Sequence, residues 1–242
     1  MHETMAIILA AGQGKRMRSN LPKPLVALQG RPIIRHLLDA TEAAGVEKIS
    51  VVVGHQSEQM CEYLGAAYAT PLQSVRLGTA HAVQIAQESV RGARDVFVFV
   101  GDSPLIRTES IVHLHEEHRR SGAACSFLTA DFAQHFPYAR VVRGEGGRVS
   151  EVVEERDCTP EQYALTEYLT SHFVFDSEKL WAALAEVQPH PKTQERYLTD
   201  VIGILMAQGE LISAVAIEDW RELVGLNTPE EVQWAEEVLT NG

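Results

Sequence analysis

The chain has 242 residues, of which 45 % are hydrophobic and 22 % charged, a balance typical of a globular protein with a sizeable core. Its 21 basic and 33 acidic residues give a net charge of −12, which argues against nucleic acid or an anionic membrane surface as a partner. Cys61, Cys125 and Cys158 share no CxxC spacing, so neither a disulfide framework nor a structural zinc site is expected.

No export signal is expected at the start of the chain. The segment MHETMAIILAAG has no basic stretch before its apolar run, and that run is far too short to span a membrane. We therefore expect a cytoplasmic protein with no membrane partner.

Strand-like and helical patterns alternate in the first half of the chain. The apolar, strand-like runs are at residues 5–10, 49–53 and 96–100, and the helical patterns between them are at 32–44 and 79–90. This alternation predicts an α/β fold with a mostly parallel sheet and right-handed crossovers. Gly12, Gly54 and Gly101 follow the three runs. We expect them at the carboxyl edge of the sheet, where open α/β sheets bind ligands.

After Gly101 the regular alternation of strand-like and helical patterns ends. A helix is predicted at 108–121, strands at 123–130, 170–175 and 211–217, and a hairpin formed by 138–143 and 148–154 around a glycine-rich turn. Thr159 and Thr228 each begin a capping box with proline at the first helical position, and the second box opens a helix at 229–239. With no linker or repeat in the sequence, residues 1–242 are predicted to form one domain. Its nucleotide-binding half runs to about residue 105, and residues 106–242 close over it.

The stretch from residue 5 to 25 carries the clearest chemical signal. Between residues 4 and 38 there are six basic residues and no carboxylate, whereas the rest of the chain has 15 basic and 33 acidic residues. Gly12 and Gly14 allow backbone N–H groups to approach phosphate oxygens closely. The spacing of Gly12, Gly14 and Lys15 does not fit the GxxxxGK[ST] pattern of a Walker loop. The GxGxxG dinucleotide fingerprint is also excluded, because Met17 stands at its third glycine position. A phosphate-binding loop and a solvated strand-to-helix loop both remain open on composition alone.

Longer motifs favour the phosphate-binding interpretation. LAAGQGKRM at 9–17, followed by LPKPL at 21–25, resembles the LAAGxGxRM…PK signature of the sugar-nucleotide pyrophosphorylases, a nucleotidyltransferase family. Further segments resemble that family in the same order along the chain: Gln73 with LGTAHA at 77–82, GDSPL at 101–105, YAR at 138–140, VEERD at 153–157, YLTD at 197–200 and GLN at 225–227. Within that family, the sequence resembles most specifically the uridylyltransferase domains of bacterial N-acetylglucosamine-1-phosphate uridylyltransferases. The acetyltransferase β-helix domain of those proteins has no counterpart in these 242 residues.

The resemblance implies a Rossmann-like, mostly parallel mixed sheet flanked by helices, of the nucleotide-diphospho-sugar transferase type. It implies an enzyme that converts UTP and N-acetylglucosamine-1-phosphate to UDP-N-acetylglucosamine, a cell-wall precursor, and pyrophosphate. A phosphate nucleophile is already ionised at neutral pH, so catalysis requires in-line positioning and charge stabilisation rather than a base. Arg16 suits the pyrophosphate leaving group, and Lys23, held between two prolines, suits the α-phosphate.

Further roles follow from the same resemblance. Asp102, at the end of an apolar run, and Asn227 are implied as ligands of Mg²⁺, which prefers oxygen donors and shares substrate phosphates. Without the resemblance, a helix-capping or turn residue is the alternative interpretation of Asp102. The implied nucleotide-binding residues are Leu9, Ala10, Ala11, Gly12, Gly14, Gln73, Gly78, Thr79 and Gly101. The implied sugar-binding residues are Ala139, Glu154, Leu169 and Thr170.

The sugar-binding segments depart from the family pattern. Ala139 replaces the glycine of YGR, and Leu169-Thr170-Ser171 occupies the place of Asn-Thr-Gly. Leucine cannot hydrogen-bond a sugar hydroxyl, and the loss of such a bond can change discrimination by orders of magnitude. Three alternatives therefore remain open: another sugar-1-phosphate, another small phosphate acceptor, or a nucleotide-sensing module without turnover. The oligomeric state, the pathway and a separate acetyltransferase partner are also open.

The histidine-rich segment at 113–118 is interpreted as structural. His113, His115 and His118 have i, i+2 and i+5 spacing, and the chain contains no HExxH motif. Zinc chemistry is therefore not expected. His81 is likewise expected to be a packing or capping residue rather than a base.

Overall fold

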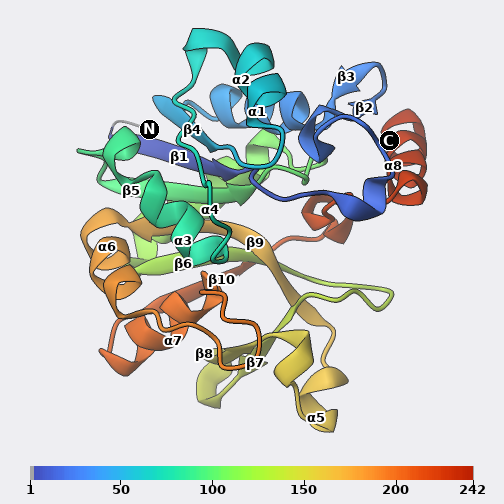
Figure 1. Ribbon diagram of the computed structural model, residues 1–242. Coiled ribbons are helices and arrows are strands. Elements are labelled where there is room, and N and C mark those ends of the chain that lie inside the picture. The colour runs from blue at the N-terminus through green and yellow to red at the C-terminus, as the bar shows by residue number, and fades with distance from the viewer. Residues whose placement is uncertain (1–2, 242) are drawn as a thin grey trace.

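A single mixed sheet forms the centre of the molecule (Figure 1). The computed structural model of the chain describes residues 3–241. Within them, eight strands are joined in the order β10-β6-β9-β5-β1-β4, and the β7–β8 hairpin is attached through β9. The strands are β1 (Thr4–Leu9), β4 (Lys48–Val52), β5 (Asp95–Val100), β6 (Cys125–Asp131), β7 (Ala139–Arg143), β8 (Val149–Val153), β9 (Glu167–Asp176) and β10 (Ile212–Ala216).

Most of these strands run in the same direction. β1 is parallel to β4 and β5, and β6 is parallel to β10. β9 is antiparallel to its neighbours β5, β6 and β7, and β8 is antiparallel to β7. The mostly parallel mixed sheet predicted from the sequence is therefore confirmed, with β9 as the reversed strand at its centre.

Helices cover both faces of the sheet because the central strands are apolar on both sides. Along β1, Ala6 and Ile8 belong to one apolar cluster, whereas Met5 and Ile7 belong to the other. The first cluster includes α1 (Ile33–Ala43), α2 (Ser57–Leu64), α4 (Thr108–Ser121) and α8 (Pro229–Asn241). The second includes α3 (Thr79–Ile85), α6 (Ser177–Glu186) and α7 (Thr199–Ala207). This alternation of burial along each strand produces the three-layer arrangement.

Short elements complete the chain. A small antiparallel pair, β2 (Ala27–Leu28) and β3 (Arg31–Pro32), lies beside α8, and α5 (Pro160–Tyr163) follows the hairpin. Single 3₁₀ turns occur as η1 (Lys15–Met17), η2 (Lys23–Leu25), η3 (Gly65–Ala67), η4 (Gln87–Val90), η5 (Glu145–Gly147), η6 (Glu155–Asp157) and η7 (Trp220–Leu223).

Both predicted capping boxes are confirmed. The Thr159 hydroxyl accepts a hydrogen bond from the Gln162 N–H, and the Gln162 side chain accepts one from the Thr159 N–H. At the start of α8, the Glu231 N–H donates to the Thr228 hydroxyl at 3.2 Å, and the Glu231 carboxylate accepts from the Thr228 N–H at 3.0 Å. Each box satisfies N–H groups that the first helical turn leaves unpaired.

The remaining predicted elements are found, with changes at several boundaries. The helix predicted at 79–90 is divided into α3 and η4, and the strand predicted at 170–175 extends to the ten residues of β9. α2, α6, α7, β2 and β3 were not predicted from the sequence. α7 contains TDVIGILMA, an almost uniformly apolar segment in which no helical periodicity is visible. No helix within residues 3–241 combines the length and apolar character needed to cross a bilayer.

Candidate functional site

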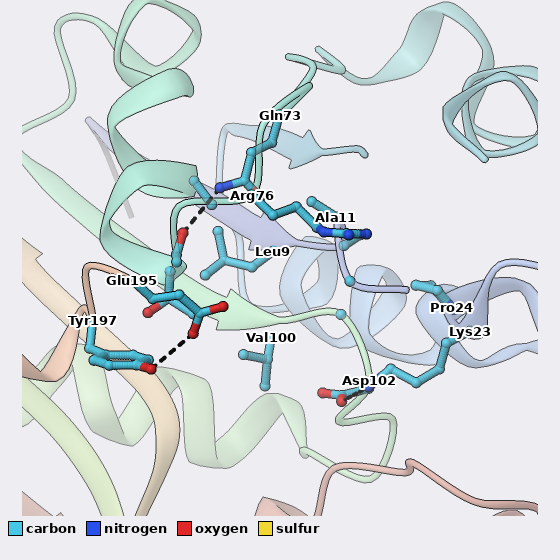
Figure 2. A pocket seen from close by; sticks show the side chains of 16 residues that line it. Leu9, Ala11, Lys23, Pro24, Gln73, Arg76, Val100, Asp102, Glu195 and Tyr197 are labelled. Carbon is cyan, nitrogen blue, oxygen red and sulfur yellow. Dashed lines mark hydrogen bonds and ion pairs between the residues drawn. The ribbon is translucent and has the colours of Figure 1, made fainter. Parts of the chain in front are cut away.

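A cavity of about 260 Å³ opens where β1 and β5 end (Figure 2). Both strands are parallel, so their carboxyl ends meet at one edge of the sheet. The cavity is lined by Leu9, Ala10, Ala11, Gly12, Lys23, Pro24, Gln73, Arg76, Gly78, Thr79, Ala82, Val100, Gly101, Asp102, Glu195 and Tyr197. It thus contains every predicted nucleotide-binding residue except Gly14.

A second cavity of about 270 Å³ adjoins the first and shares Val100 and Asp102 with it. Its lining is Arg16, Val100, Asp102, Ser103, Pro137, Tyr138, Ala139, Glu154, Leu169, Thr170, Ser171, Thr199, Gly225 and Asn227. All four predicted sugar-binding residues lie in this second cavity. Asp102 therefore stands at the junction of two spaces, each of a size suited to one part of a small ligand.

The loop after β1 carries three cations, and of these only Arg16 lines one of the two cavities. Lys15, Arg16 and Arg18 are exposed, and none of them forms an ion pair or hydrogen bond with another residue in 3–241. Gly14 has φ +56°, and a Cβ there would lie 2.6 Å from the Cβ of Lys23. Glycine is therefore required for this loop to pack against the Lys23 segment. Gly14 lines neither cavity, but it determines where Lys23 lies.

Lys23, Asp102 and Asn227 meet at one point, although they are far apart in the sequence. The Lys23 ammonium donates to Asp102 Oδ2 and, at 3.0 Å, to Asn227 Oδ1. Figure 2 shows Lys23 and Asp102 pointing toward each other at the edge of the first cavity. Charge-assisted contacts of this kind are stronger than neutral hydrogen bonds, so the ammonium is held firmly in the free protein.

The segment that carries Asn227 is built around Asp102. Gly225 lies so close to Asp102 that a Cβ would be 3.1 Å from Asp102 Oδ1, and the Leu226 N–H donates to the Asp102 carbonyl at 2.8 Å. The Gly225 N–H in turn donates to the Tyr138 hydroxyl at 3.1 Å. Burial raises the pKa of Tyr138 above its ordinary value, so the phenol stays protonated and the contact is kept at neutral pH.

The oxygen donors of Asp102 and Asn227 suit a hard divalent cation. Both converge on one cation, the Lys23 ammonium, in the free protein. No group of three or more His, Cys, Asp or Glu side chains within residues 3–241 is arranged to hold a metal. The chain can thus supply one carboxylate and one amide oxygen, and phosphate oxygens or water would complete the coordination, as Mg²⁺ sites commonly require.

The Gln73 side chain is held by the turn and the helix that directly follow it in the sequence. The Gln73 amide nitrogen donates to the Gly78 carbonyl at 3.0 Å and lies 3.1 Å from His81 Nδ1. Burial and the charge of Arg196 lower the pKa of His81, so the neutral ring can accept this bond. No described residue donates to Gln73 Oε1, which leaves this oxygen for a ligand.

The loop at 195–198 is attached to the Gly78 turn. The Arg196 N–H donates to the Leu77 carbonyl at 2.8 Å, and the Leu198 N–H donates to the Thr79 hydroxyl at 2.9 Å. These bonds bring Glu195 and Tyr197 into the first cavity, where the Tyr197 hydroxyl donates to Glu195 at 2.9 Å (Figure 2).

The floor of the second cavity is apolar where the sequence departs from the family pattern. Ala139 and Leu169 are directly paired across β7 and β9, and they are 3 % and 2 % exposed. Around them, the Thr199 hydroxyl donates to Glu154 at 2.8 Å, and the Thr170 hydroxyl lies 3.1 Å from His172 Nδ1. Two of the departures, Ala139 and Leu169, are therefore neighbours that form one apolar surface, and the third, Ser171, also lines this cavity.

Several residues of the cavities were not predicted. Arg76 and Glu195 carry no recognisable motif, and the loops that bear them converge only in three dimensions. Tyr138 lies in the YAR motif and Tyr197 and Thr199 lie in the YLTD motif, so these motifs could have indicated the three residues from the sequence. Ser171 has φ +72°, an uncommon conformation for a residue with a side chain.

Comparison with known proteins gives a consistent picture. The chain matches the family of MobA-like NTP transferase domains over residues 6–200. It is 42 % identical over 224 residues to the bifunctional protein GlmU of Exiguobacterium sibiricum, covering 92 % of this chain and 50 % of that protein. It is 38 % identical over 240 residues to GlmU of Halalkalibacterium halodurans, covering 99 % of this chain and 53 % of that protein. The chain thus spans about half the length of these curated relatives.

A solved structure shares the fold. A proposed glucose-1-phosphate thymidylyltransferase from Bacillus anthracis, solved in complex with sucrose, superposes with a TM-score of 0.81 at 18 % identity. The superposition covers 97 % of this chain and 94 % of that one. This similarity shows the fold. The family match over residues 6–200 shows that the chain belongs to the MobA-like NTP transferase domains and is a nucleotidyltransferase.

Proposed function

We propose that the chain is a magnesium-dependent sugar-1-phosphate uridylyltransferase, with UTP and N-acetylglucosamine-1-phosphate as its leading substrates. The observation that carries this proposal is the meeting of Lys23, Asp102 and Asn227 at the junction of the two cavities. A nucleotide in the first cavity and a sugar phosphate in the second would bring their phosphates together there. The relatives named GlmU and the sequence motifs that resemble uridylyltransferases support the choice of nucleotide and acceptor.

In the proposed reaction, an oxygen of the sugar phosphate attacks the α-phosphorus of the nucleotide. A new P–O bond forms, the bond between the α-phosphorus and the bridging oxygen breaks, and pyrophosphate leaves with that electron pair. The attacking phosphate is already ionised, so the protein must bring two anions together and offset their charge.

The residues at the junction fit this task. Lys23 provides an ammonium for the α-phosphate, and Arg16 provides a planar guanidinium for the departing pyrophosphate. Asp102 and Asn227 would hold Mg²⁺, which neutralises phosphate charge when bound. Gly12 and Gly14 permit close approach of backbone N–H groups to phosphate oxygens.

The test is pyrophosphate release with UTP, Mg²⁺ and a panel of sugar-1-phosphates. At least one acceptor should release pyrophosphate, and Arg16→Ala and Lys23→Ala should each lower kcat/KM by about a hundredfold or more, the scale of a lost transition-state contact. Arg18→Ala is the matched control, because Arg18 is an exposed cation of the same loop that lines neither cavity. Nucleotide binding without pyrophosphate release from any acceptor would indicate a sensing module instead.

The apolar pair formed by Ala139 and Leu169 favours a second candidate with the same chemistry and a different acceptor. A sugar hydroxyl facing Leu169 would lose its water without gaining a hydrogen bond. The acceptor panel separates the two candidates. If N-acetylglucosamine-1-phosphate is the acceptor, it should give the highest kcat/KM, and Leu169→Asn should leave it the preferred substrate. If another acceptor leads the panel, Leu169→Asn should reduce the preference for that acceptor.

A further inference from the structure

In the free protein, a lysine ammonium holds the two oxygens that the proposed function assigns to a divalent cation. Lys23 Nζ contacts Asp102 Oδ2 and lies 3.0 Å from Asn227 Oδ1. The Lys23 and Asp102 side chains are only 14 % and 15 % exposed, so solvent screens this contact weakly. An ammonium and a divalent ion at the same two oxygens would repel each other strongly, so only one of them can be bound there at a time.

The two oxygens are positioned by contacts that do not involve Lys23. The Asn227 side-chain nitrogen donates to the Gly225 carbonyl at 2.9 Å, which directs Oδ1 toward the junction. The Asn227 N–H donates to the Glu231 carboxylate. Asp102 is held through its carbonyl and by the close approach of Gly225. These contacts would keep the pair of oxygens in position when the ammonium leaves.

The lysine has a second place for its charge. Its backbone is restrained by Pro22 and Pro24 and by the close packing of Gly14. Its side chain, however, is a flexible four-carbon stem with an ammonium at its end, and Lys23 also lines the first cavity. The ammonium can therefore move from the oxygen pair into that cavity while the backbone stays in place.

We propose that Lys23 is an exchangeable placeholder for the divalent cation. In the free protein its ammonium holds the oxygens of Asp102 and Asn227. When the cation arrives with the nucleotide, the ammonium is displaced onto the nucleotide phosphates. The inference rests on the proposed function for the identity of the cation and the nucleotide. It goes beyond that function in predicting that Lys23 weakens metal binding to the free protein, although the same residue is needed for turnover.

The first test measures Mn²⁺ binding to the free protein by the electron paramagnetic resonance signal of unbound Mn²⁺. Lys23→Met removes the charge and keeps a long, flexible side chain. It should bind Mn²⁺ roughly tenfold more tightly than the wild type, the scale of one charge-assisted contact. Arg18→Met, which removes a cation that contacts neither oxygen, should change the affinity less than twofold. Equal or weaker binding by a folded Lys23→Met protein would overturn the inference.

Two further measurements keep the test decisive. Adding Asp102→Asn to Lys23→Met should abolish the gain in Mn²⁺ affinity, and a gain that persists would place the ion elsewhere and overturn the inference. In wild-type protein, the ¹H–¹⁵N signal of the Lys23 ammonium should shift when Mg²⁺ and UTP are added together. An unchanged signal under saturating Mg²⁺ and UTP would also overturn it.

These experiments separate the inference from the proposed function, since none of them includes a sugar phosphate. Tighter Mn²⁺ binding by Lys23→Met in a protein that uses no acceptor would support the exchange and refute the transferase assignment. Turnover with an acceptor, combined with unchanged Mn²⁺ affinity in Lys23→Met, would support the transferase and refute the exchange.

Discussion

At the scale of a single residue, both the backbone conformation of Gly78 and the space around it require glycine. Its φ is +99°, and a Cβ there would collide with the backbone of Arg196, whose nitrogen would be 2.6 Å away. Gly92 has a similar φ of +87°, but a Cβ at Gly92 would meet nothing within 4 Å. We expect Gly92→Ala to cost about 1 kcal/mol, the cost of the backbone conformation alone, and Gly78→Ala to cost clearly more.

Urea unfolding of both variants measures this difference. Gly78→Ala should also weaken UTP binding, because the Gly78 carbonyl positions Gln73, whereas Gly92→Ala should leave binding unchanged. Equal stability losses in the two variants would show that the contact with Arg196 relaxes without cost.

Arg76 is a cation of the first cavity that sequence motifs did not reveal. It is exposed, and it forms no ion pair or hydrogen bond with the residues that the structure describes. Figure 2 shows its side chain extending across the cavity with the guanidinium toward Ala11. Arg76→Ala is expected to raise KM for the nucleotide about tenfold with a smaller change in kcat, because a contact to bound nucleotide is lost in ground and transition states alike.

Steady-state kinetics with varied UTP tests the role of Arg76. Arg91→Ala is the matched control, since Arg91 is an exposed arginine paired with Glu88 and lines neither cavity. An unchanged KM in Arg76→Ala would show that the guanidinium remains in solvent when nucleotide binds.

At the scale of elements, α4 is joined to the sheet by a buried polar cluster. His115 contacts Asp95 on β5 at 2.8 Å, and His118 contacts Ser126 on β6 at 2.9 Å. Burial alone would raise the pKa of Asp95, but the hydrogen bond from His115 and the charge of Arg119 lower it overall. The prediction that these histidines are structural agrees with their packing against the sheet.

Two buried histidines, one in this cluster and one outside it, make the stability depend on pH. Burial lowers the pKa of His118 to about 4, and it lowers the pKa of His172 on β9 to about 4 as well. Between these values and 6.5 the unfolded chain binds protons that the folded chain does not, so stability falls as the pH falls through this window. At pH 5 the free energy of unfolding is lower than at pH 7 by about 2 kcal/mol for each of these histidines. Because the pKa of Asp95 is lowered in the folded protein, stability decreases further as the pH falls below about 4.

Urea unfolding between pH 7.5 and 5 measures this effect. In His118→Gln, the decrease in unfolding free energy between pH 7 and 5 should be smaller by the contribution of one histidine. The reason is that the amide can still bond Ser126 but does not titrate. His113→Gln should leave the slope unchanged, since His113 is exposed on the same helix. Identical slopes in the wild type and His118→Gln would contradict the neutral, buried state of His118.

At the scale of the whole molecule, one sheet joins the two halves of the chain. β1, β4 and β5 come from the first half and β6, β9 and β10 from the second, and β9 pairs with both β5 and β6. Each apolar cluster also contains residues of both halves. We propose that the chain is one cooperative domain, because neither half can bury its sheet edge or its apolar face without the other.

Calorimetric unfolding tests this proposal. A single transition is expected, with a van't Hoff enthalpy equal to the calorimetric enthalpy. UTP with Mg²⁺ should raise the midpoint of that one transition, since a ligand of the native state stabilises the whole cooperative unit. Two resolved transitions, or stabilisation of only part of the unfolding, would divide the chain into separate domains.

The sequence by itself determined the features that depend on neighbouring residues. β1, β5, α4 and the hairpin follow from local hydrophobic periodicity, and the capping boxes of Thr159 and Thr228 follow from residues three apart. The proposed phosphate-binding loop is also local, because its glycines and cations lie within one short stretch. Such patterns survive in a linear sequence, since the groups that interact are held close by the chain itself.

Tertiary structure alone decided how distant groups combine. Lys23 meets Asp102 and Asn227 across 79 and 204 residues of sequence, and Ala139 meets Leu169 because β7 pairs with β9. Arg76 and Glu195 share a cavity only because the loops that carry them converge. These meetings depend on the strand order, above all on β9 entering between β5 and β6, and burial of apolar surface from both halves selects that order. No local pattern encodes it, because the packing free energy belongs to the whole sheet rather than to any one segment.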